Sequence, residues 1–340
     1  MQTFRYVVFA AVCLLVGGCR KSDAPPPPSN RVVLYCSVDE VFAKLIINDL
    51  QKRTGLKIDV LYDTEAAKTA GLASRIRAES SRPQADVFWS SALLQTLLLN
   101  REKLLHNYVS PSARDVPASL KDAKGAWTAM GIRLHAFGWR KGTKYPPTGI
   151  AGLLEPRFKG KIGIANPSFG TSSDWVAAMA VRNGAEKTLD DFRALKKNGI
   201  QVLPGNSVVA ERVARGELAV GISDSDDWLV QKVAFEKSSD TFVVPGSVAI
   251  LKSAPRLANA KKLVDALVSK QTEDLFIKTM PGVSSTRPIV IENEDYPSGT
   301  TLDTREVHNG FLKAIPNDSA LWPAGWDKVR EPLAQILLRD

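Results

Sequence analysis

Three carboxylates stand close together in the sequence, at Asp224, Asp226 and Asp227. The apolar run 218–222 before them predicts a buried strand, and the apolar residues of 228–235 have the spacing of a helix. The carboxylates therefore lie at a strand-to-helix turn, where open α/β sheets bind their ligands. Such a cluster could bind a cation, or one Asp could cap the next helix while the others stay in solvent. The spacing alone leaves both interpretations open.

Hydroxyl and amide side chains also follow other predicted strands. The turn 168–171 leads into a helix, whose first N–H groups and dipole favour an anion. Thr171 and Asp174 also match a capping box, which is the alternative. Because the strand ends of an α/β protein converge on one cleft, we expect these side chains to lie together. The candidate anion- or ligand-binding residues are Ser168, Phe169, Gly170, Thr171, Asn206, Ser37, Ser90 and Ser91.

The sequence lacks the motifs of the common catalytic and nucleotide-binding sites. It has no glycine-rich dinucleotide fingerprint, P-loop, Gly-x-Ser-x-Gly elbow or His-Glu-x-x-His. The histidines, at 106, 135 and 308, make no ligand pattern, and the acidic run lacks the glycine and the distal glutamate of a calcium loop. A hydrolase that uses the acidic cluster stays the least favoured alternative. We expect no catalysis and no catalytic cofactor.

Composition indicates a soluble globular protein of 340 residues, with 44% hydrophobic and 24% charged residues, which is enough for two lobes. The formal charge is +9, but the lysines and arginines are scattered among acids. We therefore expect no nucleic-acid partner.

The N-terminus resembles an export signal. Arg5 precedes the apolar stretch 6–16, which is too short to span a bilayer. The segment 15–19 resembles the lipobox of bacterial lipoproteins, which implies removal of residues 1–18 and lipidation of Cys19. Residues 19–30 contain four consecutive prolines and predict a stiff tether. Cys36 would then be the remaining unmodified cysteine, and we expect it to be small and buried.

Strand-like and helix-like segments alternate along the chain, which predicts an α/β fold with parallel sheets. The predicted strands are 31–36, 56–62, 85–89, 161–165, 200–203, 218–222 and 247–251. The predicted helices include 64–80, 171–182, 207–215, 228–235, 257–269 and 322–338. The stretch 127–139 reads as a longer strand that runs between two lobes.

Several stretches, together with Trp228, carry a resemblance to a known family. The stretches are 33–37, 83–90, 153–163, 205–210 and 216–221. As a set they resemble the ferric-iron-binding branch of type II periplasmic solute-binding proteins of ABC importers. The resemblance implies two α/β lobes, each a sheet flanked by helices, with hinge strands between them. Lobe 1 would comprise 31–132 plus 246–294, and lobe 2 would comprise 133–245 plus 295–340.

In that family a His, a Glu, a Tyr pair and an anion hold the iron. These ligands fall on Asp39, Ser91, Asp226 and Asp227, and the anion loop falls on residues 169–171. Supporting asparagines fall on Asn206 and Asp224. The resemblance thus implies an all-oxygen site of four aspartates for a hard cation, with Fe³⁺ favoured and Ca²⁺ or Mn²⁺ as alternatives, accompanied by an anion. Crowded carboxylates should also raise some of their own pKa values.

The predicted function is that of a monomeric solute-binding lipoprotein that delivers its ligand to an ABC importer permease. It would lie in the periplasm or at the cell surface and contact the membrane only through its lipid anchor. Two alternatives concern the ligand. An organic cation such as a polyamine could bind the same acids, with Trp228 or Trp89 in cation–π contact, and a phosphonate-like solute could bind the helix starts.

Overall fold

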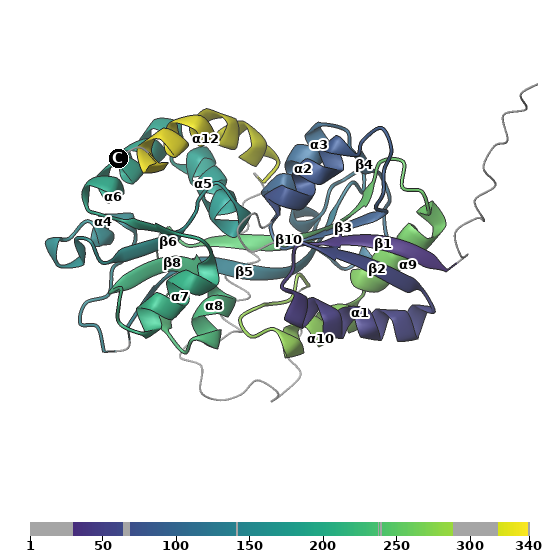
Figure 1. The fold of residues 1–340 in the computed structure, drawn as a ribbon, viewed down its shortest axis with the longest axis horizontal. Coiled ribbons are helices and arrows are strands. Elements are labelled where there is room, and N and C mark those ends of the chain that lie inside the picture. Colours follow the sequence, from purple (N-terminus) through teal and green to yellow (C-terminus); the bar gives the residue numbers. More distant parts are fainter. Residues whose placement is uncertain are drawn as a thin grey trace, which may run out of the picture.

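The computed structural model describes residues 30–63, 69–140, 142–236, 238, 240–287 and 319–338. Its strands form one ten-stranded sheet in the order β2-β1-β3-β10-β5-β8-β6-β7, with β4 added to β10 and β9 added to β5. Helices flank both halves of this sheet (Figure 1), which confirms the expected two-lobed α/β fold. In the described part of the chain, no helix has the length and apolar character needed to span a membrane.

The first half is built around three parallel strands, β1 (Arg31–Cys36), β2 (Lys57–Tyr62) and β3 (Val87–Ser90). Their crossovers are the helices α1 (Glu40–Thr54) and α2 (Ala70–Ala78). Gly55 ends α1 in the left-handed conformation, as expected of a C-terminal glycine. The remaining elements are α3 (Leu94–Arg101), β4 (Leu105–His106), α9 (Leu257–Leu267) and α10 (Lys270–Thr279), and Figure 1 shows α1 and α10 side by side.

The second half has its own parallel strands, β6 (Ile162–Ala165), β7 (Gln201–Leu203) and β8 (Val220–Asp224). The C-terminal helix α12 (Trp322–Leu338) has its predicted bounds and packs on the helices of this half. The other elements are α4 (Ile150–Leu153), α5 (Gly170–Arg182), α6 (Ala185–Lys197), α7 (Asn206–Ala214), α8 (Ser225–Val230) and β9 (Ala234–Glu236).

Two long antiparallel strands join the halves, β5 (Thr128–Trp139) and β10 (Phe242–Leu251). The predicted connecting strand 127–139 is β5, and the predicted strand 247–251 is the second part of β10. The pairing shifts register between Pro245 and Ser247, next to Gly246, whose missing side chain lets the two strands approach. The lobe boundaries that we propose, between 132 and 133 and between 245 and 246, lie inside these strands.

The structure corrects two predictions and adds two helices. The predicted helix 228–235 is wrong beyond Val230, because 234–236 forms β9 and pairs with β5. The described part of the predicted helix 64–80 is helical only over 70–78. The polar helices α6 and α10 were not predicted. The signal, the tether up to residue 29 and Cys19 lie outside the described residues. Cys36 is buried and unpaired, as expected.

Candidate ligand-binding site

The strand ends of both halves meet at one cleft of about 460 Å³ that opens to solvent. Nine of the predicted site residues line it, from β1 and β3 on one side and from β6, β7 and β8 on the other. They are Asp39, Ser91, Phe169, Gly170, Thr171, Asn206, Asp224, Asp226 and Asp227. The predicted convergence of strand ends is therefore found in the structure.

Three predicted residues do not line this cleft. The Ser37 hydroxyl accepts the backbone N–H of Ser91 at 2.9 Å, and the Ser90 hydroxyl donates to the Ala92 carbonyl at 2.5 Å, so both hold the local backbone. The Ser168 N–H donates to the Asn166 side chain, which shapes the turn before α5.

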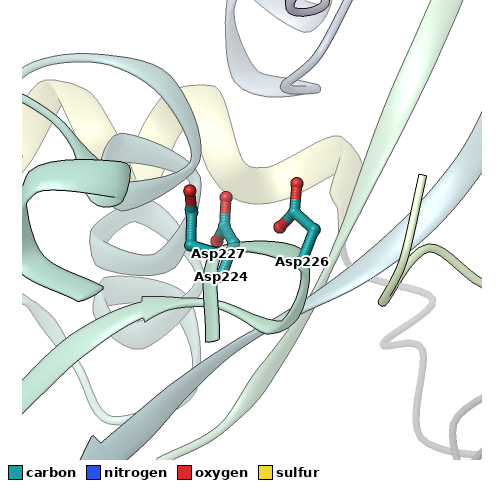
Figure 2. A group of neighbouring side chains, drawn as sticks. All are labelled: Asp224, Asp226 and Asp227. Atoms are coloured by element: carbon teal, nitrogen blue, oxygen red, sulfur yellow. The ribbon is translucent and has the colours of Figure 1, made fainter. Parts of the chain in front are cut away.

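The carboxylates of Asp224, Asp226 and Asp227 each place an oxygen within 4.8 Å of the others. Asp224 is the last residue of β8, while Asp226 and Asp227 lie in the first turn of α8. Figure 2 shows the three carboxyl groups on the same side of this turn. The cluster is thus a compact acceptor for positive charge or for hydrogen-bond donors.

Asp224 is saturated by donors of the protein itself. The first carboxylate oxygen lies 2.6 Å from His135 Nδ1. The second oxygen accepts the Thr171 hydroxyl at 2.6 Å and the Asn206 amide at 3.1 Å. Arg133 Nη1 lies 3.4 Å from the same oxygen. Asp224 therefore orients the beginnings of α5 and α7, and a ligand would displace these donors in order to reach it.

Arg133 on β5 is the main site residue that the sequence did not indicate. Its guanidinium Nη1 lies 3.2 Å from Asp226 Oδ2, and its Nη2 donates to the Ser91 carbonyl of the other half. The side chain is only 10% exposed. A single Arg inside a strand has no spacing signature, and its position depends on the pairing that sets His135 opposite Asp224. This guanidinium places a positive charge at the base of the acidic cluster.

The charges of the cluster shift its protonation. Burial alone would raise the pKa of Asp224, but the Arg133 charge and the bond from His135 outweigh burial and hold this pKa below its ordinary value. The expected rise from carboxylate crowding therefore does not hold for Asp224. Burial would lower the pKa of Arg133, but the surrounding carboxylates raise it above its ordinary value. The two groups stay charged as a pair.

The beginnings of α5 and α7 border the cleft and have no side-chain cap. The capping box considered as the alternative for Thr171 and Asp174 does not form, because the Thr171 hydroxyl donates to Asp224. Asp174 instead accepts the backbone N–H groups of Leu93 and Leu94, at 2.6 and 3.0 Å, at the start of α3 in the other half. The uncapped helix starts are suited to an anionic group.

The two tryptophans considered for cation–π contact are core residues. Trp228 and Trp89 are fully buried, and Trp228 Nε1 donates to the Ala136 carbonyl at 3.2 Å. Neither ring lines the cleft.

A family model described as bacterial extracellular solute-binding protein matches residues 32–279. The chain belongs to this family, whose members are not enzymes. The major ferric iron-binding protein of Neisseria meningitidis serogroup B is 25% identical over 341 residues, which cover 92% of this chain and 98% of that protein. The putative 2-aminoethylphosphonate-binding periplasmic protein of Salmonella typhi is 23% identical, over 78% of this chain and 77% of that protein.

Solved structures have the same fold. Iron-bound HitA from Pseudomonas aeruginosa superimposes with a TM-score of 0.74 at 18% identity, over 89% of this chain and 99% of that one. AfuA from Actinobacillus pleuropneumoniae, with fructose-6-phosphate bound, gives a TM-score of 0.71 at 24% identity, over 88% and 98%.

Proposed function

We propose that this protein is the extracytoplasmic receptor of an ABC importer for a small organic solute with a cationic group and a phosphonate- or phosphate-like group. The observation that carries the choice of ligand is Arg133, buried among the carboxylates at 3.2 Å from Asp226 and 3.4 Å from Asp224. This ligand class combines the two alternatives that the sequence left open.

Arg133 weakens the site for a metal ion, because its guanidinium already pairs with Asp224 and Asp226, whose oxygens the metal would need as ligands. It also repels a cation: two unit charges 4 Å apart repel by about 4 kcal/mol at an effective dielectric constant of 20. Since Asp224 is saturated by donors of the protein, Asp39, Asp226 and Asp227 are the carboxylates that we assign to the ligand. An ammonium group donates three hydrogen bonds and can share these acceptors.

The other end of the cleft suits an anionic group. The uncapped starts of α5 and α7 offer backbone N–H groups and the positive ends of two helix dipoles. A zwitterionic solute would match the cleft at both ends. The relative named for 2-aminoethylphosphonate supports this class.

A hard metal cation with an accompanying anion is the second candidate. The carboxylate oxygens within 4.8 Å of one another favour it, since Fe³⁺, Ca²⁺ and Mn²⁺ accept oxygen ligands. In the family that the sequence resembles, phenolate ligands confer ferric selectivity. Asp226 and Asp227 replace those ligands in this chain.

Calorimetric titration of metal-stripped protein tests the proposal. The panel comprises 2-aminoethylphosphonate, spermidine, Ca²⁺, Mn²⁺, and Fe³⁺ with and without carbonate. We expect the aminophosphonate to bind and to stabilise the fold by about 4 kcal/mol at a thousand times its dissociation constant. Binding of a metal alone, with no organic solute bound, would replace the first candidate by the second.

A matched pair of variants tests the site. Asp227→Asn should weaken binding at least tenfold with little loss of stability, because it removes one charge that faces the cleft. Asp190→Asn, on the exposed face of α6, is the control and should bind like the wild type. Undiminished binding by Asp227→Asn would place the site elsewhere.

We also propose that the protein is anchored by a lipid on Cys19 and acts as a monomer. Metabolic labelling with palmitate and membrane fractionation of the full chain test the anchor. Cys19→Ala should lose the label and move to the soluble extracytoplasmic fraction.

A further inference from the structure

A second, smaller cavity adjoins the cleft that the four aspartates line, which we call the acidic cleft. Asp39, Ser91 and Arg133 line both cavities, so the two spaces meet at these residues. We call the second cavity the apolar compartment. Its other lining residues are Val38, Ser90, Met130, Gly131, Gly246, Phe276, Met280 and Val283.

The apolar compartment differs sharply from the acidic cleft in chemistry. Five of its lining side chains are buried hydrocarbon or thioether groups, whereas four aspartates line the acidic cleft. Away from the shared boundary, the compartment has no charged side chain among the described residues. It therefore suits an uncharged carbon group and offers nothing to a hydrated ion.

Close packing at two glycines shapes the apolar compartment. A Cβ on Gly131 would lie 2.9 Å from Phe276 and from Val283, and a Cβ on Gly246 would lie 2.7 Å from the Met130 carbonyl oxygen. Both glycines belong to the strands that join the halves. The backbone of β5 and β10 therefore forms one wall of the apolar compartment.

The apolar compartment is also coupled to the carboxylates. The Ser225 hydroxyl donates to the Gly282 carbonyl at 2.7 Å, and a Cβ on Gly282 would lie 2.6 Å from the Asp226 backbone. The segment that carries Val283 is thus fixed against the start of α8. A ligand bound to Asp226 lies beside Arg133, at the entrance to the compartment.

We infer that the ligand is amphipathic: its charged groups lie in the acidic cleft, and an apolar substituent passes Arg133 into the apolar compartment. The inference rests on the proposed function and narrows its ligand class to organic ions with a short hydrocarbon side chain. The Arg133 guanidinium at the boundary can accommodate such a substituent. Its planar face tolerates apolar contact, while its edges keep their hydrogen bonds.

Titration with a graded series of 1-aminoalkylphosphonates tests the inference. The probes are aminomethylphosphonate, 1-aminopropylphosphonate and 1-aminobutylphosphonate. Each added methylene that enters the compartment should tighten binding by about fourfold, so the longest should bind more than tenfold tighter than the shortest. Equal affinity across the series would overturn the inference and leave the proposed function standing. If the whole series fails to bind while 2-aminoethylphosphonate binds, the inference alone is overturned, and if 2-aminoethylphosphonate also fails to bind, the proposed function falls with it.

Two valine-to-phenylalanine variants distinguish the effect of filling the apolar compartment from the general effect of a larger side chain. Val283→Phe should abolish the increase in affinity with chain length. Its affinity for aminomethylphosphonate should stay within about threefold of the wild-type affinity. Val60→Phe, on the edge strand β2, should show the same increase in affinity with chain length as the wild type. If Val283→Phe folds, as judged by circular dichroism and thermal unfolding, and still shows the wild-type gain, the compartment does not hold the substituent. A structure of the 1-aminobutylphosphonate complex gives the same answer if Val283→Phe fails to fold.

Discussion

At the scale of single residues, Asp224 and Asp226 have different roles although both are acidic and buried. Asp224 receives donors from three elements, through His135, Thr171 and Asn206. Its charge is used inside the protein to hold the helix starts around the cleft. We assign the neighbouring carboxylates of α8 to the ligand.

Replacement of Asp224 by Asn should lower the free energy of unfolding by about 3 kcal/mol at pH 7, because it leaves buried donors and a buried guanidinium with weaker partners. The pKa of Asp224 lies below its ordinary value, so its contribution is present above pH 4 and is lost as the pH falls through the folded-state pKa. Urea unfolding at pH 7 and at pH 3 checks this. An unchanged difference between the variant and the wild type at the two pH values would contradict it.

The sequence predicted the acidic residues of the site but neither of their basic partners. Asp226 and Asp227 follow an apolar run, and this local pattern is visible without a structure. Arg133 and His135 reach them only through the pairing of β5 with β8, about 90 residues apart in the chain, and a single sequence does not contain that pairing. The same limit applies to Asp174, whose hydrogen-bond partners lie in the other half.

At the scale of elements, the position of α8 depends on glycines in neighbouring strands. The Trp228 ring lies over Gly138 of β5, where a Cβ would come within 2.6 Å of it, and over Gly221 of β8, where the distance would be 3.0 Å. The missing side chains of these glycines leave room for the Trp228 ring. The packed ring in turn fixes the position of α8, which carries Asp226 and Asp227.

Gly138→Ala should therefore displace Trp228 and move α8. We expect a loss of stability of about 1–3 kcal/mol, which is typical of overpacking, and a clear loss of ligand affinity. Tryptophan fluorescence, urea unfolding and calorimetric titration measure the three effects. Wild-type binding by this variant would show that α8 does not depend on the ring.

A second link between elements joins α5 to α3 through the fully buried carboxylate of Asp174. Burial raises the pKa of Asp174 to about 7, although the two backbone N–H groups act in the opposite direction. Between about pH 4 and pH 7 the folded protein therefore binds more protons at this site than the unfolded chain. Stability from this group falls as the pH rises through that range.

Asp174→Asn removes that titration. The stability advantage of the wild type over this variant should shrink by about 1.4 kcal/mol for each pH unit between pH 5 and pH 7 and then level off. Guanidinium unfolding of both proteins at pH 5, 6, 7 and 8 measures the trend. A constant difference across these values would mean that Asp174 titrates in the folded state as it does in the unfolded chain.

At the scale of the whole molecule, the two halves touch through polar contacts in addition to the joining strands. Arg133 bonds the Ser91 carbonyl, Asp174 bonds the start of α3, and Arg101 of α3 pairs with Asp327 of α12 at 2.6 Å. The alternation of strands and helices predicted the parallel strands of each half, although it missed α6 and α10. How closely the halves approach depends on these long-range contacts, which no local pattern encodes.

The combined variant Asp174→Asn/Arg101→Gln should therefore open more readily than the wild type. Small-angle X-ray scattering without ligand should give it a larger radius of gyration, and saturating ligand should reverse the difference. Glu102→Gln/Asp274→Asn, which alters ion pairs within the first half, is the control. Equal radii for the wild type and the combined variant would show that other contacts set the approach of the halves.

The place of β1 in the sheet has a mechanical consequence. The strand enters the first half at Arg31, roughly 17 Å from the cleft end at Cys36, and parallel neighbours bond it on both sides. A force on the residues before Asn30, along the axis of β1, would load these hydrogen bonds in shear at the same time. It would not break them one after another. The N-terminal segment therefore attaches to a strand that resists such a pull, at the end of that strand farthest from the cleft.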